Sequence, residues 1–317
     1  MNIYSENKSQ FTRNLWLATL FLVVCWTWGS TWLGIKVAVD TIPPLTAAGL
    51  RFLVAFPFFF VLAKFLKEPI KYPKQHNSFF YIVTIVYFIL PYFFLNYGEQ
   101  FVSSGLTSLL FSSMPVWIII FSMIMLKVKV YTNQVIGIVI GFVSLFMVLR
   151  SESVTIDHDG ALGITAIIAA ALMHAYIYVY TKLKGTQIPV ITYNTLPIGI
   201  AGFVLLFAGI ILEDPQWSQF SFESILSTLY LGIIASAGGF LAYFYLLKKV
   251  NTVVLSFIFV IFPVFALVLS SWYEQQQMQA ESYFFVATLL IGFAITKFEM
   301  TSLLGLKRRY IEKSELK

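Results

Sequence analysis

The chain has 317 residues, of which 59% are hydrophobic and 11% are charged, and its mean hydropathy is +0.82. A soluble domain is about half apolar and roughly a quarter charged, so this composition excludes a soluble protein and predicts an integral membrane protein. The net charge of +6 does not indicate a nucleic-acid partner, because the basic residues lie in short loops between apolar runs.

No metal and no other cofactor is expected. Cys25 is the only cysteine, which excludes an internal disulfide and a cysteine-based metal site. The three histidines, His76, His158 and His174, are isolated from one another and have no metal-ligand spacing.

The first apolar run resembles a signal peptide, because Lys8 and Arg13 precede it. The segment 22–25 also resembles a lipoprotein cleavage site. However, Val24 is bulky where such a site needs a small residue, and the apolar run continues past Cys25 to Val39. We therefore predict an uncleaved first membrane helix.

Apolar runs bounded by polar clusters follow one another along the whole chain. They predict membrane helices near 15–38, 45–65, 79–98, 104–126, 132–149, 161–181, 190–212, 225–246, 252–272 and 280–297. Helices are expected because lipid offers no hydrogen-bond partners to an open backbone. The predicted fold is an all-α integral membrane protein with ten transmembrane helices.

Lys and Arg outside these helices lie almost entirely on one side of the predicted membrane. Eighteen of them fall in the N-terminal tail, in the loops after the second, fourth, sixth and eighth spans, and in the C-terminal region. The opposite loops contain Arg150 alone and are otherwise acidic or neutral. The positive-inside rule therefore places both termini in the cytoplasm. Lys36 and Arg51 are the two cationic residues that remain inside helices.

The two halves of the chain resemble each other. A shift of 148 positions aligns Tyr97–Pro115 with Tyr245–Pro263, and a shift of 146 positions aligns Lys36 with Lys182. We predict two homologous five-helix repeats at 15–149 and 161–297, an outer loop at 150–160, a cytoplasmic tail at 1–14 and a basic tail at 298–317. Because five is odd, the second repeat enters the membrane inverted, as in secondary transporters that work by alternating access.

Lys36 and Arg51 are candidates for a substrate-binding or gating role, because a charged side chain inside a span usually faces the protein interior or a wet cavity. Lys36 shares a helix face with Gly29 and Trp32. This combination of a cation and a flat apolar wall suits a substrate with a carboxylate and an apolar body. Alternatively, Lys36 extends to the membrane interface and Arg51 pairs with Asp40.

Other side chains are predicted to line a central cavity. They are Trp28, Asn96, Tyr97, Ser108, Ser112, His174, Tyr178, Tyr243 and Ser256. His174 is either a proton relay, because imidazole titrates near neutral pH, or a structural hydrogen-bonding group. The repeat-matched prolines Pro115 and Pro263 are either hinges or ordinary kinks. The GxxxG pattern at 137–141 permits close helix contact, and a homodimer is one interpretation of it.

The segment WGSTWLGIKVAVDTIPPLTAAGLRFLVA (Trp28–Ala55) resembles the start of EamA-type proteins of the drug/metabolite transporter superfamily. SSGLTSLLFSSMPV (Ser103–Val116) is similar to the fourth span of that family. The resemblance implies a ten-helix carrier of the bacterial inner membrane with a central cavity, usually an exporter. Many relatives carry Gly-Glu where this chain has Lys127-Val128 and Gln275-Gln276.

These observations predict a secondary transporter that exports a small metabolite such as an amino acid, with that small molecule and membrane lipid as its partners. One alternative is a multidrug or toxic-compound exporter, which would need an anionic cavity. A more distant alternative is a membrane enzyme that acts on lipid substrates, which would need clustered acids and histidines. Asp157, His158 and Asp159 are adjacent in sequence rather than on one helix face, so no enzyme is expected.

Overall fold

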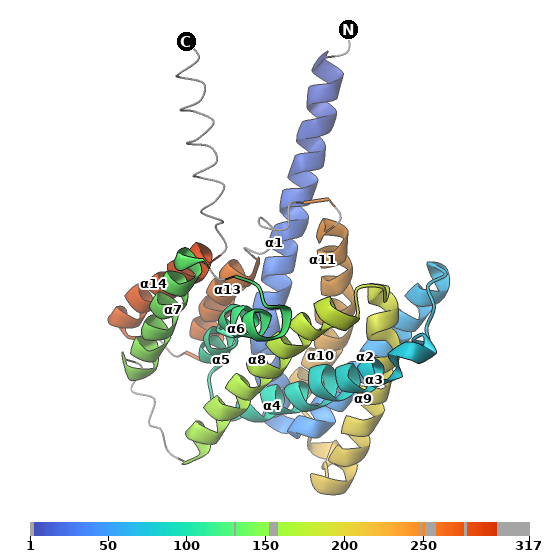
Figure 1. Cartoon of the computed structure of the whole chain (residues 1–317). Helices are drawn as coiled ribbons and strands as arrows, with labels where there is room; N and C mark the ends of the chain where they lie inside the picture. The colour runs from blue at the N-terminus through green and yellow to red at the C-terminus, as the bar shows by residue number, and fades with distance from the viewer. Residues whose placement is uncertain are drawn as a thin grey trace, which may run out of the picture.

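Figure 1 shows the computed structural model, which describes residues 3–129, 131–151, 158–247, 249–250, 258–275 and 278–296. Every regular element in these segments is a helix, which confirms the all-α prediction. The α-helices are α1 (Ile3–Thr41), α2 (Pro44–Phe65), α3 (Asn77–Val83), α4 (Leu90–Gly98), α5 (Ser104–Phe111), α6 (Met114–Leu126), α7 (Thr132–Ser151), α8 (His158–Lys184), α9 (Val190–Leu212), α10 (Phe222–Tyr230), α11 (Gly239–Leu247), α13 (Ile258–Tyr273) and α14 (Ala280–Ile295). The π-helical segments are η2 (Thr84–Ile89) and η4 (Leu231–Gly238), and the 3-10 turns are η1 (Lys74–His76) and η3 (Trp217–Gln219).

Seven helical segments are long and apolar enough to cross a membrane. They are Thr12–Thr41, Pro44–Phe65, Lys74–Gly98, Ser104–Leu126, His158–Lys184, Val190–Leu212 and Phe222–Tyr243. Shorter apolar helices at Thr132–Val148, Ile261–Tyr273 and Ala280–Ile295 occupy the places of the fifth, ninth and tenth predicted spans. The chain is therefore a multi-pass membrane protein, and the count of ten spans stays a prediction. The beginning of the predicted ninth span, 252–257, lies outside the described residues.

Large apolar side chains cover much of the outside of the helix bundle. Phe65 is 81% exposed, Leu212 75% and Trp272 71%. Each Å² of such surface is unfavourable in water by about 25 cal/mol, whereas lipid removes this cost. Because a helix satisfies its backbone hydrogen bonds within one segment, the same sequence can place these side chains against lipid.

Two glutamates that directly follow helices cap the beginnings of other helices. Glu213, after α9, accepts hydrogen bonds from the backbone N–H of Leu45 (2.7 Å) and of Thr46 (2.9 Å) in the first turn of α2. Glu274, after α13, accepts one from the backbone N–H of Ser104 (3.1 Å) at the start of α5. The first N–H groups of a helix lack partners inside it, so these carboxylates satisfy donors that would otherwise be unpaired.

The two ends of the bundle differ in charge. Glu213 and Glu274 belong to one end, which we call the acidic end. Lys64 and Lys182 lie in the last turns of α2 and α8 at the other end, which we call the basic end. Helix α1 begins at Ile3, so most of the segment predicted as an N-terminal tail continues this helix, which extends beyond its neighbours in Figure 1.

The fourth predicted span is interrupted in its middle. Helix α5 ends at Phe111, a turn at Ser112 and Ser113 follows, and α6 starts with Pro115 in its first turn. Proline suits this position because the N–H that it lacks would have no partner inside the helix. Pro263, in contrast, lies inside the continuous helix α13. The two predicted hinges thus occupy different local structures, and their hinge role stays a prediction.

The packing between the two halves is symmetric. Helix α2 packs along α9, and α7 packs along α14. Helix α1 contacts α10, α11 and α13, and α8 makes the matching contacts with η2, α4, α5 and α6. The two π-helical segments also match, since η2 lies in the third predicted span and η4 in the eighth. Helices that are five predicted spans apart therefore make equivalent contacts, as expected of two related halves.

The glycines of the GxxxG pattern in α7 face another helix of the same chain. A Cβ atom at Gly292 of α14 would lie 2.9 Å from the carbonyl oxygen of Gly137, and the Phe293 ring fills the space beside Gly141. Figure 1 shows α7 and α14 side by side at one flank of the bundle. The GxxxG glycines that suggested a homodimer thus already contact a helix of the same chain. The homodimer stays a prediction, and this pattern no longer supports it.

Candidate functional site

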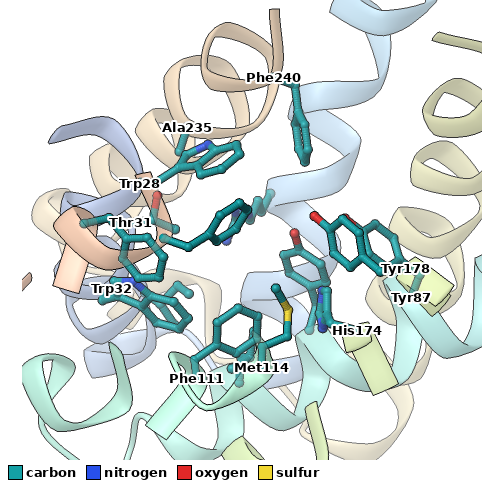
Figure 2. Close-up of a pocket in the computed structure, with 16 residues that line it drawn as sticks. Trp28, Thr31, Trp32, Tyr87, Phe111, Met114, His174, Tyr178, Ala235 and Phe240 are labelled. Atoms are coloured by element: carbon teal, nitrogen blue, oxygen red, sulfur yellow. The ribbon is translucent and has the colours of Figure 1, made fainter. Parts of the chain in front are cut away.

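A cavity of about 110 Å³ lies among helices from both halves of the chain (Figure 2). Its lining residues come from α1, α2, η2, α4, α5, α6, α8, η4, α11 and α13. They are Trp28, Thr31, Trp32, Ile35, Arg51, Tyr87, Tyr92, Leu95, Phe111, Met114, His174, Tyr178, Ala235, Phe240, Phe259 and Phe262. Most of these side chains are aromatic, and among the described lining residues Arg51 carries the only permanent charge.

Arg51 reaches this cavity from α2 and is only 4% exposed. Its Nε donates a hydrogen bond to Ser236 Oγ (3.2 Å) in the π-helical segment η4, and its Cζ lies 5.0 Å from the centre of the Tyr92 ring. Its Nη1 is buried and has no hydrogen-bond acceptor among the described residues. A buried donor without an acceptor is costly, so the guanidinium is suited to receive an oxygen atom from a ligand.

The alternative in which Arg51 pairs with Asp40 is wrong. Among the described residues the one side-chain ion pair joins His158 and Asp159, and Asp40 is exposed at the end of α1. Within the described segments, no carboxylate in direct contact therefore balances the charge of Arg51.

Two tryptophans of α1 form one wall of the cavity (Figure 2). The ring centre of Trp32 lies 5.0 Å from that of Phe111, and the ring centre of Trp28 lies 5.0 Å from that of Tyr243. The indole Nε1 of Trp32 is buried, and the part of the chain that the structure describes offers it no acceptor. The site thus combines flat apolar walls with two unpaired N–H donors, from Arg51 and Trp32.

His174 lies on the opposite wall, beside Tyr87 and Tyr178 in Figure 2. Its Nδ1 is 2.9 Å from the carbonyl oxygen of Ala170 in the same helix. Because a carbonyl oxygen only accepts, Nδ1 carries the proton of the imidazole. This bond within one helix is typical of the structural alternative, and the proton-relay role stays a prediction.

A second cavity, of about 170 Å³, leads from the first toward the basic end. Trp28, Tyr87, Tyr178 and Phe240 line both cavities. The second one continues along Thr181, Gly185, Ile188, Val190, Tyr193, Asn194 and Tyr243, where α8 ends and α9 begins. Tyr178 is 40% exposed although it lines both cavities. The two cavities together form a path between the centre of the bundle and its basic end.

Lys36 does not line either cavity. Its Nζ donates hydrogen bonds to the backbone carbonyl oxygens of Glu99 (2.6 Å), Gln100 (3.4 Å) and Val102 (3.3 Å) in the turn between α4 and α5. This turn lies at the acidic end. The structure therefore separates the two cations, because Arg51 faces the cavity whereas Lys36 binds a turn.

Gly29 and three polar candidates do not line the two cavities. Gly29 permits helix packing, and the polar side chains form hydrogen bonds within their own helices. A Cβ atom at Gly29 would lie 2.8 Å from the carbonyl oxygen of Phe262, so this glycine lets α1 approach α13. Asn96 donates to the carbonyl oxygen of Tyr92, one turn earlier in the same helix. Ser108 and Ser112 bond in the same way to the carbonyl oxygens of Gly105 and Ser108.

Tyr97 is half-buried and packs on Phe93 and Phe101. Ser256 lies outside the described residues. Of the predicted residues, Trp28, Trp32, Arg51, His174 and Tyr178 meet in the central cavity, and Tyr243 lines the second one.

Much of the aromatic lining of the cavity was not predicted from the sequence. Tyr87, Tyr92, Phe111, Phe259 and Phe262 line the cavity, but aromatic residues are common in every span of this chain, so their type alone did not distinguish them. The general rule that ligand sites are mostly apolar, with few polar groups, could have indicated an aromatic lining but not which aromatic residues form it.

The sequence matches a known family twice, once in each half. The model of the EamA-like transporter family matches residues 15–150 and again residues 161–298. The chain belongs to the EamA-like transporter family. The resemblance noted at Trp28–Ala55 is thus confirmed for the whole membrane region. Proteins of this EamA-like family are transporters, which are in general not enzymes.

Similar proteins agree with this assignment. The EamA-like chain is 38% identical to Protein PagO of Salmonella typhimurium (strain LT2) over 284 residues, which are 90% of this chain and 93% of that protein. It is 36% identical over 277 residues to an uncharacterized transporter of Buchnera aphidicola subsp. Schizaphis graminum, which are 87% of this chain and 92% of that protein. A solved crystal structure with 14% sequence identity matches with a TM-score of 0.67, covering 91% of this chain and 98% of that one, and shows the fold alone.

Proposed function

We propose that this EamA-like chain is a secondary transporter that works by alternating access and exports a small metabolite with an anionic group and an apolar body, such as an amino acid. The unpaired Nη1 of Arg51 in an aromatic cavity carries the proposal. A carboxylate would supply the missing acceptor, and a charge-assisted hydrogen bond is about twice as strong as a neutral one. The aromatic walls would bury the apolar body of the metabolite.

The proposed path runs between the two halves. In this arrangement ten helices form two inverted repeats, both termini lie in the cytoplasm, and the protein is in the bacterial inner membrane. The basic end then faces the cytoplasm. Because the second cavity leads toward that end, the conformation described above is the inward-open one, which accepts its substrate from the cytoplasm.

A multidrug exporter for cations is the less favoured function. Arg51 would repel a cation, and no carboxylate is among the described residues that line the two cavities. Desolvated like charges are unfavourable at short range, so a cationic drug would need a different orientation or site.

Transport by the purified chain in liposomes tests the proposal. The panel contains amino acids, nucleosides and cationic drugs, and protein-free liposomes give the background rate. We expect at least one amino acid with an apolar side chain to cross faster than the background. If no compound is accelerated, the transporter proposal is wrong, and acceleration of cationic drugs alone would favour the multidrug alternative.

The role of Arg51 is tested by Arg51→Gln. Binding of the transported amino acid is followed by tryptophan fluorescence, because Trp28 and Trp32 line the cavity. Loss of a charge-assisted hydrogen bond costs about 1.5–3 kcal/mol, so we expect the Kd to rise roughly 10- to 150-fold. Lys64→Gln, which removes an exposed charge at the basic end, is the control and should leave the Kd unchanged. An unchanged Kd in Arg51→Gln would remove Arg51 from the binding site.

A further inference from the structure

Glu99 is a buried carboxylate that no hydrogen bond satisfies. It directly follows α4, in the turn that leads to α5 at the acidic end. The residue is 0% exposed, and in the described segments neither Oε1 nor Oε2 has a hydrogen-bond partner. An ionised carboxylate in such a place lacks both water and donors, which is among the most costly arrangements in a protein.

The nearest cation is engaged elsewhere. Lys36 has three N–H donors, and the carbonyl oxygens of Glu99, Gln100 and Val102 are its three acceptors. An ammonium group bonded in this way has no donor left for the Glu99 carboxylate. The arrangement is the one expected when Glu99 is protonated and neutral, because a neutral carboxyl does not compete for the ammonium.

The other charged groups around Glu99 are few. Helix α1 contributes Lys36, α2 contributes Arg51, and Glu274 approaches from the end of α13. Helix α8 packs on the preceding Gly98 with Gly163 and Ile167, which carry no charge. Glu274 itself is bound by the backbone N–H of Ser104 and by Ser270 Oγ. Among these described groups, Lys36 is the cation whose three acceptors all belong to the turn that contains Glu99.

We propose that Glu99 is a proton-binding site, and that release of its proton transfers Lys36 from the three carbonyl oxygens of the α4–α5 turn to the Glu99 carboxylate. The proton leaves to water at the acidic end, and Lys36 changes only its hydrogen-bond partners. Without Lys36, three carbonyl oxygens of the turn lose their donor, and the turn loosens. When Glu99 binds a proton again, Lys36 returns to the turn and closes it.

The direction of the titration follows from the surroundings. Burial raises the pKa of Glu99 well above its usual range, and the positive charge of Lys36 opposes this rise. The proton is therefore retained at pH values where an exposed glutamate has already lost its own, and it is released as the pH rises further. Removal of the Lys36 charge should therefore raise the pKa of Glu99 further.

This proposal extends the proposed function. Proton binding by Glu99 stands by itself, whereas the use of the α4–α5 turn as a gate at the outer end rests on the proposed function. In a transporter whose acidic end faces outward, a turn that loosens on proton release would couple opening of that end to the proton gradient. Proton binding itself needs no substrate, so it can be measured separately from transport.

Infrared difference spectroscopy of the full chain in lipid nanodiscs tests the site. A protonated buried carboxyl gives a C=O band, which is followed as a function of pH. We expect a component of this band in the wild type with a midpoint at least about one pH unit above the ordinary value for Glu of about 4.3. Glu99→Gln should lack this component, whereas Glu223→Gln, which changes an exposed acid at the same end, should keep it.

Two further measurements keep the test decisive if Glu99→Gln folds poorly. Lys36→Met should move the midpoint of the Glu99 component to higher pH. Hydrogen exchange of the peptide 99–104 in the wild type, corrected for intrinsic rates, should accelerate above the same midpoint.

The proposal is overturned if the component survives in Glu99→Gln, if its midpoint is that of an exposed glutamate, or if Lys36→Met lowers the midpoint or leaves it unchanged. These outcomes do not depend on any transported compound. A titrating Glu99 together with failure of the whole transport panel would instead contradict the proposed function and leave the proton site in place.

Discussion

At the scale of single residues, Glu213 connects two helices that are far apart in the sequence. Its carboxylate accepts from the backbone N–H groups of Leu45 and Thr46 and from Thr46 Oγ1 (2.8 Å). Glu213→Gln replaces one acceptor oxygen by an NH2 group that faces a donor. We expect the free energy of unfolding to fall by about 1–2 kcal/mol, the usual cost of losing a helix cap, measured by denaturant unfolding in detergent micelles.

The neighbouring Asp214 offers a matched control for this prediction. Asp214 is exposed, and its φ of 45° is a conformation that asparagine also tolerates. Asp214→Asn should therefore leave the free energy of unfolding unchanged. Equal stability of the two variants would show that the Glu213 cap contributes nothing measurable.

At the scale of elements, close contact of α2 with α9 depends on glycine. A Cβ atom at Gly49 would lie 2.7 Å from the Cα atom of Leu206, and one at Gly202 would lie 2.9 Å from the backbone nitrogen of Leu53. Backbone atoms cannot move aside cheaply, so Gly49→Ala must push the two helices apart. Overpacking of this kind costs about 1–3 kcal/mol, which should appear as a lower thermal unfolding temperature in micelles.

Gly238→Ala is the control at this scale. The nearest atom to a Cβ at Gly238 is the carbonyl oxygen of Ile233 at 3.7 Å, an ordinary contact distance. Alanine there should leave the unfolding temperature unchanged or raise it slightly, because alanine is the better helix former. If Gly49→Ala were as stable as Gly238→Ala, close contact between α2 and α9 would not require glycine.

At the scale of the whole molecule, the path from the cavity to the basic end predicts which residues a water-soluble reagent can reach from that end. Thr181 lines this path, whereas Ser108 is fully buried in α5. A cysteine at Thr181→Cys should react with a membrane-impermeant maleimide added from the cytoplasmic side. The native Cys25 is 0% exposed and should give a low background.

Ser108→Cys is the matched variant for the labelling experiment and should stay unreactive from both sides. Reaction of Thr181→Cys in intact cells, where the reagent meets only the outer side, would contradict the inward-open assignment and the proposed orientation. Addition of a transported compound should slow the labelling from the cytoplasmic side, because the proposed alternating access would close that path for part of the cycle.

The sequence and the structure contributed differently to the candidate site. Lys36 and Arg51 were both recognisable as exceptions, because the charge pattern of the loops left them inside helices. Only the fold decided that Arg51 reaches the cavity and that Lys36 binds the α4–α5 turn. Glu99 was not among the predicted site residues, because it lies near the end of a predicted span and its burial is visible only in the fold.

The sequence by itself determined what is local. Apolar runs bounded by polar clusters predicted the helices, and matched residues indicated that the two halves are related. The tertiary structure decided which face of each helix meets which neighbour, as when Gly137 and Gly141 were found against α14 rather than against a second copy. The physical reason is that an apolar run predicts a helix but not how that helix is rotated about its own axis. Every face of an apolar helix is compatible with lipid, so packing against other helices alone decides which face points into the bundle.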